Sequence, residues 1–185
     1  MEVKVSKKAK LPTRFGDFII QSFNYKDKDH LCIIKGEIKE KMNIRIHSEC
    51  LTGDALGSLK CDCREQLEYA LKYINENGGM VIYLRQEGRG IGLFNKINAY
   101  ALQDEGFDTL EANLKLGFKD DEREYSLVEF ILEYYNIKEV SLLTNNPQKL
   151  KAISKDVKRV PIIMKENEFN KNYLKVKECK MGHML

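Results

Sequence analysis

Three cysteines gathered in a short stretch carry the clearest chemistry in this sequence. Cys50, Cys61 and Cys63 lie in HSECLTGDALGSLKCDC, and only Cys32 and Cys179 occur elsewhere. A zinc ion with three protein ligands keeps its fourth position for water, which is the arrangement of catalytic rather than structural sites. The spacing differs from the paired C-x2-C of zinc ribbons, and a free buried thiol is the simpler interpretation of any one cysteine. Taken together, the three predict a catalytic metal centre.

A glycine-rich segment with an arginine in its middle is the second candidate. EGRGIG, residues 87–92, separates an apolar run from a helical pattern. Glycines let backbone N–H groups approach an anion, and a helix N-terminus favours negative charge. The segment is neither G-x-G-x-x-G nor a Walker A loop, so a tight structural turn stays an alternative. Arg89, with Arg85 and Lys96 close in sequence, favours phosphate. A metal beside a phosphate cradle indicates hydrolytic chemistry on a nucleotide.

Two polar clusters lie further along the chain. Asp121-Glu122-Arg123 falls between two predicted helices, where a solvated charge cluster is the simplest interpretation. Thr144-Asn145-Asn146 ends an apolar run just before a helix, which is where open α/β sheets commonly bind ligands. Lys149 lies one turn into that helix and could reach a phosphate.

Two groups of predicted elements must position these residues: strands in the first part of the chain, and alternating helices and strands in the later part. Residues 15–20, 31–38 and 42–48 are predicted strands, 64–76 a helix with apolar residues at i, i+3, i+4 and i+7, and 80–85 a buried strand. Helices are then predicted after Gly92, from Asp108 with Glu111 as a capping box, and from Ser126 with Glu129 as another.

Strand 139–144 precedes a helix that begins at Asn146-Pro147, and 159–164 is the last predicted strand. Antiparallel-looking strands followed by βαβα alternation predict a single α/β domain over 1–185, with a mixed β-sheet flanked by helices. The polar tail, 165–185, is not placed by its pattern.

Composition limits the class of protein. The chain has 185 residues, 43% hydrophobic and 32% charged, with a net charge of +3 that is too small to indicate a nucleic-acid binder. No apolar h-region follows MEVKVSKKAK, and no apolar run reaches the ~20 residues of a membrane span. The chain has five cysteines, an odd number, which favours free thiols over a set of disulfides. Thiols stay reduced in the cytosol, so a cytoplasmic protein is expected.

Together these segments closely resemble the GTP cyclohydrolase II family, whose zinc enzymes begin riboflavin synthesis. The resemblance runs from about residue 11 to the end, with the motifs in family order. The matching segments are RIHSECLTGDALGSLKCDC, YLRQEGRGIGLFNKINAYALQDEGFDTLEANLKLGF, DDEREY, LLTNNPQK and the terminal KMGHML. Some members are fused to a dihydroxybutanone-phosphate synthase domain, for which this chain has no room, so it resembles the stand-alone form.

The resemblance implies a role for each matching residue. Cys50, Cys61 and Cys63 would bind one Zn²⁺ per subunit. Tyr100 would lie near the reacting purine carbon, Asp121 would accept a proton, and Arg123 would attack the α-phosphate. Residues implied to contact GTP, through its guanine edge and phosphates, are Arg45, Ile46, His47, Ser48, Glu49, Gln66, Glu87, Gly88, Arg89, Thr109, Thr144 and Lys149.

The implied reaction converts GTP to 2,5-diamino-6-ribosylamino-4(3H)-pyrimidinone 5′-phosphate, formate and pyrophosphate. Mg²⁺ would accompany the GTP phosphates, and family members resemble homodimers. A covalent role for Arg123 meets a chemical objection, because a guanidinium with a pKa above ~12 is almost never neutral. Stabilisation of transition-state charge by Arg123 is therefore the alternative.

Two other functions fit parts of the pattern. His47-Ser48-Glu49 matches the H-x-E of zinc nucleobase deaminases, but these enzymes also need P-C-x-x-C, which the chain lacks. A non-catalytic nucleotide-binding module with a structural zinc would need a fourth protein ligand, with His47 or Asp62 as candidates.

Overall fold

One mixed sheet runs through the computed structural model, which describes residues 1–119 and 121–184. In this described part the strand order is β1-β3-β4-β6-β5-β7-β8, with β2 also paired to β3. The first strands pair antiparallel, whereas β5, β6, β7 and β8 run parallel to one another, which confirms the predicted mixed sheet. The strands are β1 (Lys4–Val5), β2 (Ala9–Thr13), β3 (Gly16–Tyr25), β4 (Lys28–Lys35), β5 (Lys41–Ser48), β6 (Gly79–Leu84), β7 (Glu139–Leu143) and β8 (Asp156–Val160).

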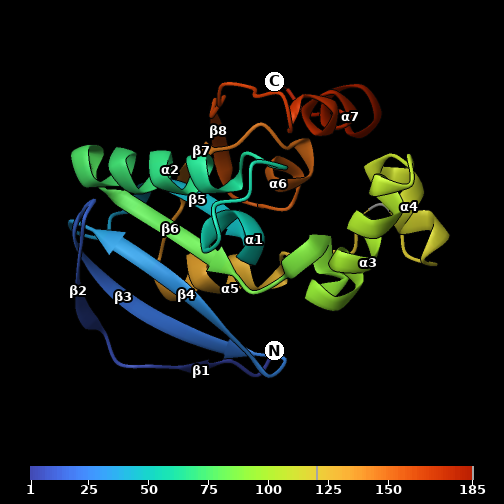
Figure 1. Cartoon of the computed structure of the whole chain (residues 1–185). Coiled ribbons are helices and arrows are strands. Elements are labelled where there is room, and N and C mark those ends of the chain that lie inside the picture. Colours follow the sequence, from blue (N-terminus) through green and yellow to red (C-terminus); the bar gives the residue numbers. More distant parts are fainter. Residues whose placement is uncertain (120, 185) are drawn as a thin grey trace.

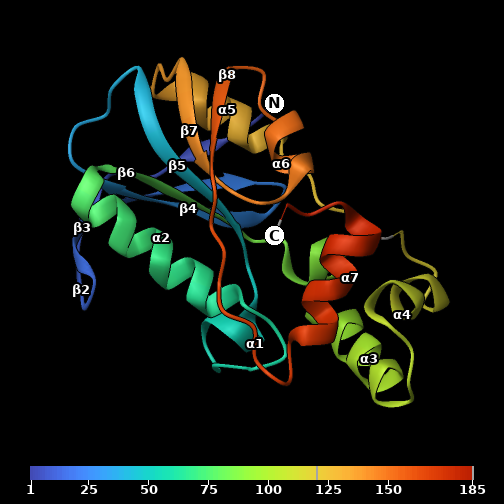
Figure 2. The same cartoon turned by 90° about the horizontal axis from the view of Figure 1, so that it is seen from above.

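Helices cover both faces of the sheet. Figure 1 shows α2 on one face and α5 on the other, while α3 and α4 extend beyond the end of the sheet. The last helix, α7, lies against α4 (Figure 2). None of these helices is long and apolar enough to cross a membrane, in the part of the chain that is described. The helices are α1 (Leu51–Asp54), α2 (Cys63–Asn77), the 3-10 turn η1 (Glu87–Gly90), α3 (Gly92–Asp104), α4 (Thr109–Lys115), α5 (Ser126–Tyr134), α6 (Pro147–Lys151) and α7 (Lys171–Met181).

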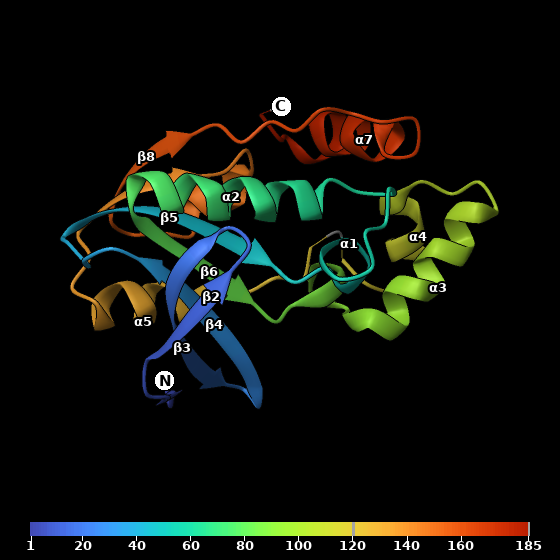
Figure 3. The same cartoon turned by 60° about the vertical axis from the view of Figure 1, so that its left-hand side comes forward.

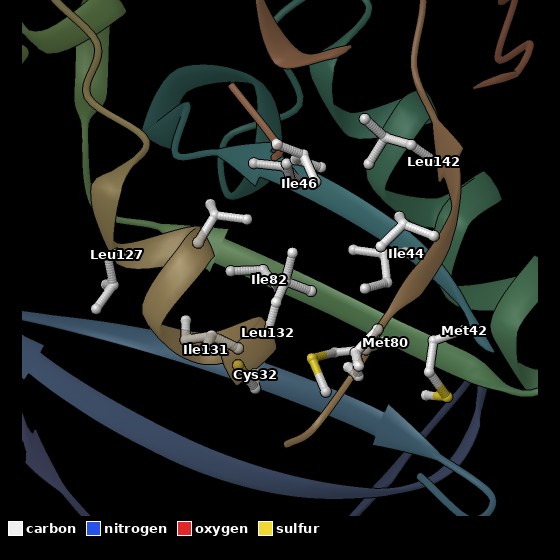
Figure 4. Packing of buried hydrophobic residues seen from close by; sticks show 14 of the residues in the cluster. Cys32, Met42, Ile44, Ile46, Met80, Ile82, Leu127, Ile131, Leu132 and Leu142 are labelled. Atoms are coloured by element: carbon white, nitrogen blue, oxygen red, sulfur yellow. The ribbon is translucent and has the colours of Figure 1, made fainter. Parts of the chain in front are cut away.

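Strand alternation divides the core between the two faces. On β5 the side chains of Met42, Ile44 and Ile46 pack against α5 (Figure 4). Successive side chains of a strand point to opposite faces, so Arg45 and His47 are directed to the other face, where α2 lies. Both are nevertheless buried, at 4% and 2% exposure. Buried polar groups need hydrogen-bond partners. The two side chains therefore indicate that this part of the sheet belongs to a polar site rather than to the apolar core.

The parallel strands bring their carboxyl ends to one edge of the sheet. Ser48 at the end of β5 pairs with Leu84 at the end of β6, and β7 runs parallel on the other side of β5. Each strand leads into a helix at this edge: β5 into α1, β6 into η1 and β7 into α6. Figure 3 shows β5 leading into α1. Segments far apart in the sequence therefore meet there.

Two local predictions are wrong. The last strand ends at Val160 rather than 164, because Pro161 has no N–H to donate to a neighbouring strand. The capping box at Ser126 does not form, and Tyr125 is the N-cap. Ser126 instead donates to Glu124, and Glu129 accepts from the Ser154 amide.

The other caps are confirmed. Asp108 accepts from the Leu110 and Glu111 amides, and Glu111 accepts from the Asp108 amide in return. Asn146 accepts from the Gln148 amide at 2.8 Å, before Pro147 at the first position of α6. Strands β1 and β2 were not predicted, because they are only 2 and 5 residues long and lie in a largely polar segment.

Candidate active site

The three predicted metal ligands come together at the edge of the sheet. Cys50 follows β5 and is the N-cap of α1, Cys61 lies in the following loop, and Cys63 begins α2. Their sulfur atoms all lie within 4.8 Å of one another, and those of Cys50 and Cys61 are 3.7 Å apart. Tetrahedral Zn²⁺ with Zn–S bonds of ~2.3 Å places two sulfurs roughly 3.8 Å apart. The group can therefore hold a metal ion of this kind.

A glycine makes room for the cluster. A Cβ atom on Gly53 would lie 2.9 Å from the Cys61 sulfur and 3.1 Å from the Cys50 sulfur. These distances are shorter than a carbon atom and a sulfur atom normally tolerate. Space, rather than an unusual backbone conformation, excludes a side chain at this position.

No fourth protein ligand joins the cysteines among the residues that the structure describes. Both candidates for closing the site are bound elsewhere. His47 Nε2 lies 3.1 Å from the carboxylate of Asp54, and Asp62 accepts from Gln66 at 2.6 Å and from Lys177 at 2.9 Å. The described residues therefore favour a three-ligand arrangement over a closed, four-ligand one.

A buried lysine contacts the cluster. Lys96 Nζ donates to the Cys50 sulfur at 3.2 Å, to Thr52 Oγ1 at 2.8 Å and to Glu87 Oε1 at 2.8 Å. Burial lowers the pKa of Lys96, but the hydrogen bond to Glu87 and the charge of Cys50 outweigh it, and the net shift is upward. Hydrogen bonds from the Cys61 and Cys63 thiols lower the pKa of Cys50, which favours a thiolate there.

A cleft of about 730 Å³ opens in front of the cysteines, and we call it the metal cavity. Its walls come from the end of β5, the start of α2 with the loop before it, and η1, α3, α4 and α7. Its polar and reactive side chains are Ser48, Glu49, Cys50, Lys60, Cys61, Cys63, Glu87, Arg89, Lys96, Tyr100, Gln103, Thr109, Asn113, Arg123 and Tyr173.

A second cleft of about 590 Å³ adjoins the first, and we call it the cationic cavity. Among the residues that the structure describes, five positive side chains line it and no Asp or Glu does: Arg45, Arg89, Arg123, Lys149 and Lys177. The two cavities share the wall residues Ser48, Cys63, Arg89, Arg123 and Tyr173. A ligand that spans this wall would meet the cysteines at one end and a cluster of positive charge at the other.

Two of these positive groups lie deep in the protein, and no carboxylate of a described residue forms an ion pair with them. Arg45 donates to the carbonyl of Leu143 and to the side-chain oxygen of Gln66, and Lys149 donates to the carbonyl of Ile46. Burial lowers the pKa of Arg45 to about 10. Burial also lowers the pKa of Lys149, and the positive charges of Arg45, Arg123 and Lys177 lower it further. An anion in the cationic cavity would relieve this repulsion.

Arg123 differs from the other two because it has an acidic partner. Its Nε donates to Asp121 Oδ1 at 2.8 Å, and its Nη2 donates to Asp121 Oδ2. Burial lowers the pKa of Arg123, but the Asp121 hydrogen bond and the neighbouring Tyr125 more than reverse this, so the net shift is upward. The guanidinium therefore stays protonated.

Most of the predicted site residues reach a cavity wall. Ser48, Glu49, Glu87, Gly88, Arg89, Tyr100, Thr109 and Arg123 line the metal cavity, and Arg45, His47, Gln66, Thr144 and Lys149 line the cationic cavity. Ile46 and Asp121 are on neither wall. The Ile46 side chain lies in the core, and Asp121 is buried beside Arg123.

The predicted carboxylates already have partners within the chain. Glu49 pairs with Arg85 at 2.8 Å. Glu87 Oε2 accepts from the Leu51 amide at 2.6 Å, while Oε1 accepts from Lys96. Glu87 therefore ties η1 to the start of α1, directly beside Cys50.

Sequence reasoning missed the contribution of the tail. Tyr173, Lys177 and His183 line the cationic cavity, although their segment has no clear pattern. The terminal KMGHML, which contains His183, was the one available signal. Lys96 was expected near phosphate, whereas the structure places its ammonium on Cys50 and Glu87.

Comparison with known proteins gives a consistent result. The family described as GTP cyclohydrolase II matches residues 3–160. The chain is 64% identical to a GTP cyclohydrolase-2 of Campylobacter hominis, over 100% of this chain and 97% of that protein. It is 58% identical to one of Helicobacter pylori strain P12, over 99% and 98%.

More distant similarities were also found. The chain is 52% identical to a GTP cyclohydrolase-2 of Picrophilus torridus, over 96% of both chains. A crystal structure of RibBX, a two-domain 3,4-dihydroxy-2-butanone 4-phosphate synthase from A. baumannii, is similar at a TM-score of 0.48 and 18% identity, over 88% of this chain and 40% of that one. The family match and the full-length relatives show that this chain is an enzyme of the GTP cyclohydrolase II family.

Proposed function

We propose that the protein uses Zn²⁺ held by Cys50, Cys61 and Cys63 to hydrolyse GTP. The products would be 2,5-diamino-6-ribosylamino-4(3H)-pyrimidinone 5′-phosphate, formate and pyrophosphate, as the first step of riboflavin biosynthesis. The observation that carries this proposal is the joining of a three-thiol cluster to a cationic cavity through a shared wall.

The two cavities suit the two ends of GTP. The guanine would lie in the metal cavity, and the phosphates, accompanied by Mg²⁺, in the cationic cavity. Bound Zn²⁺ would supply a Lewis acid that activates water for hydrolysis at guanine C8. The Lys96 hydrogen bond to the Cys50 sulfur would keep that thiolate in place and moderate its charge.

Tyr100 is suited to handle a proton at the guanine. Its hydroxyl lies 3.4 Å from Thr52 Oγ1, at the wall of the metal cavity. Burial raises the pKa of Tyr100 above its ordinary value of 10.0, so the phenol is neutral near pH 7. A neutral phenol can donate a proton to the nitrogen that leaves C8 when the imidazole ring opens.

Arg123 would act on the phosphates. It lies on the shared wall, which is where the α-phosphate of a GTP that spans both cavities would fall. Because the guanidinium stays protonated beside Asp121, it would stabilise the charge that develops as pyrophosphate leaves. Asp121 would orient Arg123 rather than contact GTP itself.

Exposed apolar side chains support a homodimer. Leu56 and Leu59 lie between α1 and α2, and Lys60 of the same loop pairs with Asp104 at the end of α3. Phe94 on α3 is 80% exposed and Leu56 is 74% exposed. Apolar side chains exposed in this way commonly mark an interface between proteins. The free state of all five cysteines fits a cytoplasmic location.

An assay of all products at once tests the proposed function. Purified protein with GTP, Zn²⁺ and Mg²⁺ should release formate and pyrophosphate in equal amounts, together with a product of the expected mass. Cys61→Ser should lose formate release because one metal ligand is gone. Ammonia in place of formate would identify a deaminase, and neither product in the presence of bound GTP would identify a binding module.

A further inference from the structure

The C-terminal segment, residues 171–184, forms part of both cavities although it lies outside the residues 3–160 matched by the family. Tyr173 of α7 lies on the wall that the cavities share, while Lys177 and His183 line the cationic cavity. Figure 2 shows α7 near α4, which it contacts, at the end of the sheet where the site lies. The segment is therefore placed to contact a ligand.

Specific contacts hold this segment in place. Lys177 Nζ donates to Asp62 Oδ1 at 2.9 Å. In the sequence, Asp62 stands between Cys61 and Cys63, two of the proposed metal ligands. At the other end, the Met184 amide donates to the carbonyl of Asn145, and Arg159 donates to the carbonyl of Met184. Both ends of the wall are thus tied to elements that already belong to the site.

The positive side chains that line the cationic cavity would be stabilised by a bound anion. Lys177 adds a fifth positive side chain to Arg45, Arg89, Arg123 and Lys149. Two further atoms of residues lining this cavity, Arg45 Nε and His47 Nδ1, are buried without a hydrogen-bond partner among the described residues. Buried polar atoms of this kind are normally satisfied. A bound polyanion, with the water or metal it carries, would supply partners.

Lys177 can serve Asp62 and a phosphate together. An ammonium group has three donors, and one of them points to Asp62. Asp62 has a second partner of its own, because Gln66 donates to its other oxygen at 2.6 Å. Burial of Lys177 is offset by Tyr173 and by Asp62, and its pKa shifts upward, so the side chain remains charged.

We infer that Lys177 is a further GTP-binding residue, which contacts the phosphate chain in the cationic cavity. This inference rests on the proposed function, because it assumes that a nucleoside triphosphate occupies the two cavities. It assigns to the C-terminal helix a direct part in substrate binding, with Tyr173 lying between the phosphates and the metal cavity.

Lys177→Met tests the inference, with Lys175→Met as its matched control. Lys175 is exposed on the same helix, so its substitution removes the same charge outside the cavity. Calorimetry on the zinc-loaded protein would measure the affinity for GTP and for inorganic tripolyphosphate, and NMR would measure guanosine binding. Lys177→Met should weaken GTP and tripolyphosphate binding by about 10- to 100-fold, the size expected for a lost charge-assisted hydrogen bond. Guanosine binding should be unchanged, and Lys175→Met should bind all three ligands as the wild type does.

Asp62→Asn separates phosphate binding from support of the metal loop. This variant keeps the Lys177 charge and removes its ionic partner, so tripolyphosphate binding should persist. The inference is overturned if Lys177→Met binds tripolyphosphate normally, or if Asp62→Asn loses as much affinity as Lys177→Met. It is also overturned if Lys177→Met loses its zinc or its guanosine binding, since Lys177 would then be only structural.

The proposed function fails by a different observation. If wild-type protein releases no formate from GTP, the proposed function is wrong, and the inference falls with it. If wild-type protein releases formate and pyrophosphate but Lys177→Met matches it in tripolyphosphate affinity, only the inference is wrong.

Discussion

The ammonium of Lys96 lies 3.2 Å from the sulfur of Cys50, and Glu87 and Thr52 hold it there. Three thiolates donate much charge to a metal, which weakens it as a Lewis acid. A positive group that donates a hydrogen bond to one sulfur withdraws part of that charge. Outer partners of metal ligands tune a site in this way.

Lys96→Met should lower kcat/KM for formate release by about 10- to 100-fold, the usual effect of losing an outer partner of a metal ligand. In Co²⁺-substituted protein, the sulfur-to-cobalt charge-transfer band should move to longer wavelength, because the sulfur electrons are no longer stabilised. Lys60→Met is the control, since the Lys60 ammonium also lies over the Tyr100 ring, at 4.9 Å from its centre, but donates to Asp104 rather than to a sulfur. An unchanged band in Lys96→Met would mean that the lysine supports only packing.

Gly53→Ala should reduce metal affinity. The added methyl group would lie 2.9 Å from the Cys61 sulfur and must push the ligands apart. We expect a loss in zinc affinity of about 10-fold or more, by analogy with other disturbed ligand shells, measured by competition with a chelator. Ala55→Ser adds an atom at an exposed position nearby and should retain its zinc. Normal zinc affinity in Gly53→Ala would show that the loop relaxes around the methyl group.

Arg123→Lys should still release pyrophosphate from GTP, at a reduced rate, without any guanylyl group on the enzyme. A lysine keeps the positive charge but lacks the planar fork that meets both oxygens of Asp121. Arg123→Gln should lose pyrophosphate release by about 100-fold or more, as for other lost oxyanion contacts. Mass spectrometry of quenched wild-type enzyme is the decisive measurement, since a guanylylated Arg123 would establish the covalent role.

Acid should destabilise the protein through its histidines. Burial and the nearby positive charges of Lys177, Arg123, Lys149 and Arg89 lower the pKa of His183 from 6.5 to about 3. The unfolded chain then binds a proton that the folded chain does not, so the free energy of unfolding falls as pH drops below 6.5. Burial lowers the pKa of His30 and His47 as well, which adds to the same trend.

Urea unfolding between pH about 7 and about 4.5, above the range where most carboxylates titrate, would measure this dependence. His183→Asn should give a shallower fall than the wild type. Equal slopes for the two proteins would show that His183 does not carry the effect.

The fold was largely predictable because its strands and helices have clear local patterns. The apolar alternation of β5, with Ile44 and Ile46 in the core, is visible in the sequence. The cysteine cluster was predictable too, since its residues are close along the chain. The end of β8 was missed because Pro161 interrupts an otherwise apolar run.

Long-range polar contacts were beyond prediction for a physical reason. Nothing near Lys96 in sequence reveals that Cys50 will lie beside it, and Arg89 in the preceding glycine-rich segment favours a phosphate interpretation instead. Lys177 stands in a polar helix whose spacing does not show which lysine is buried. The packing of α7 against the rest of the chain decides which lysine is buried. It buries Lys177 and leaves Lys175 exposed to solvent.

The contact between Asp62 and Lys177 links the metal centre to the end of the chain. Asp62 stands between two of the thiols that can hold a metal, so an ion bound by Cys61 and Cys63 would also fix the carboxylate to which α7 is tied. Removal of the metal should therefore speed amide hydrogen exchange in α7, far along the sequence from any cysteine ligand. By thermodynamic reciprocity, a nucleotide that orders α7 would strengthen the hold on the metal. The enzyme would then retain its ion most firmly while substrate is bound.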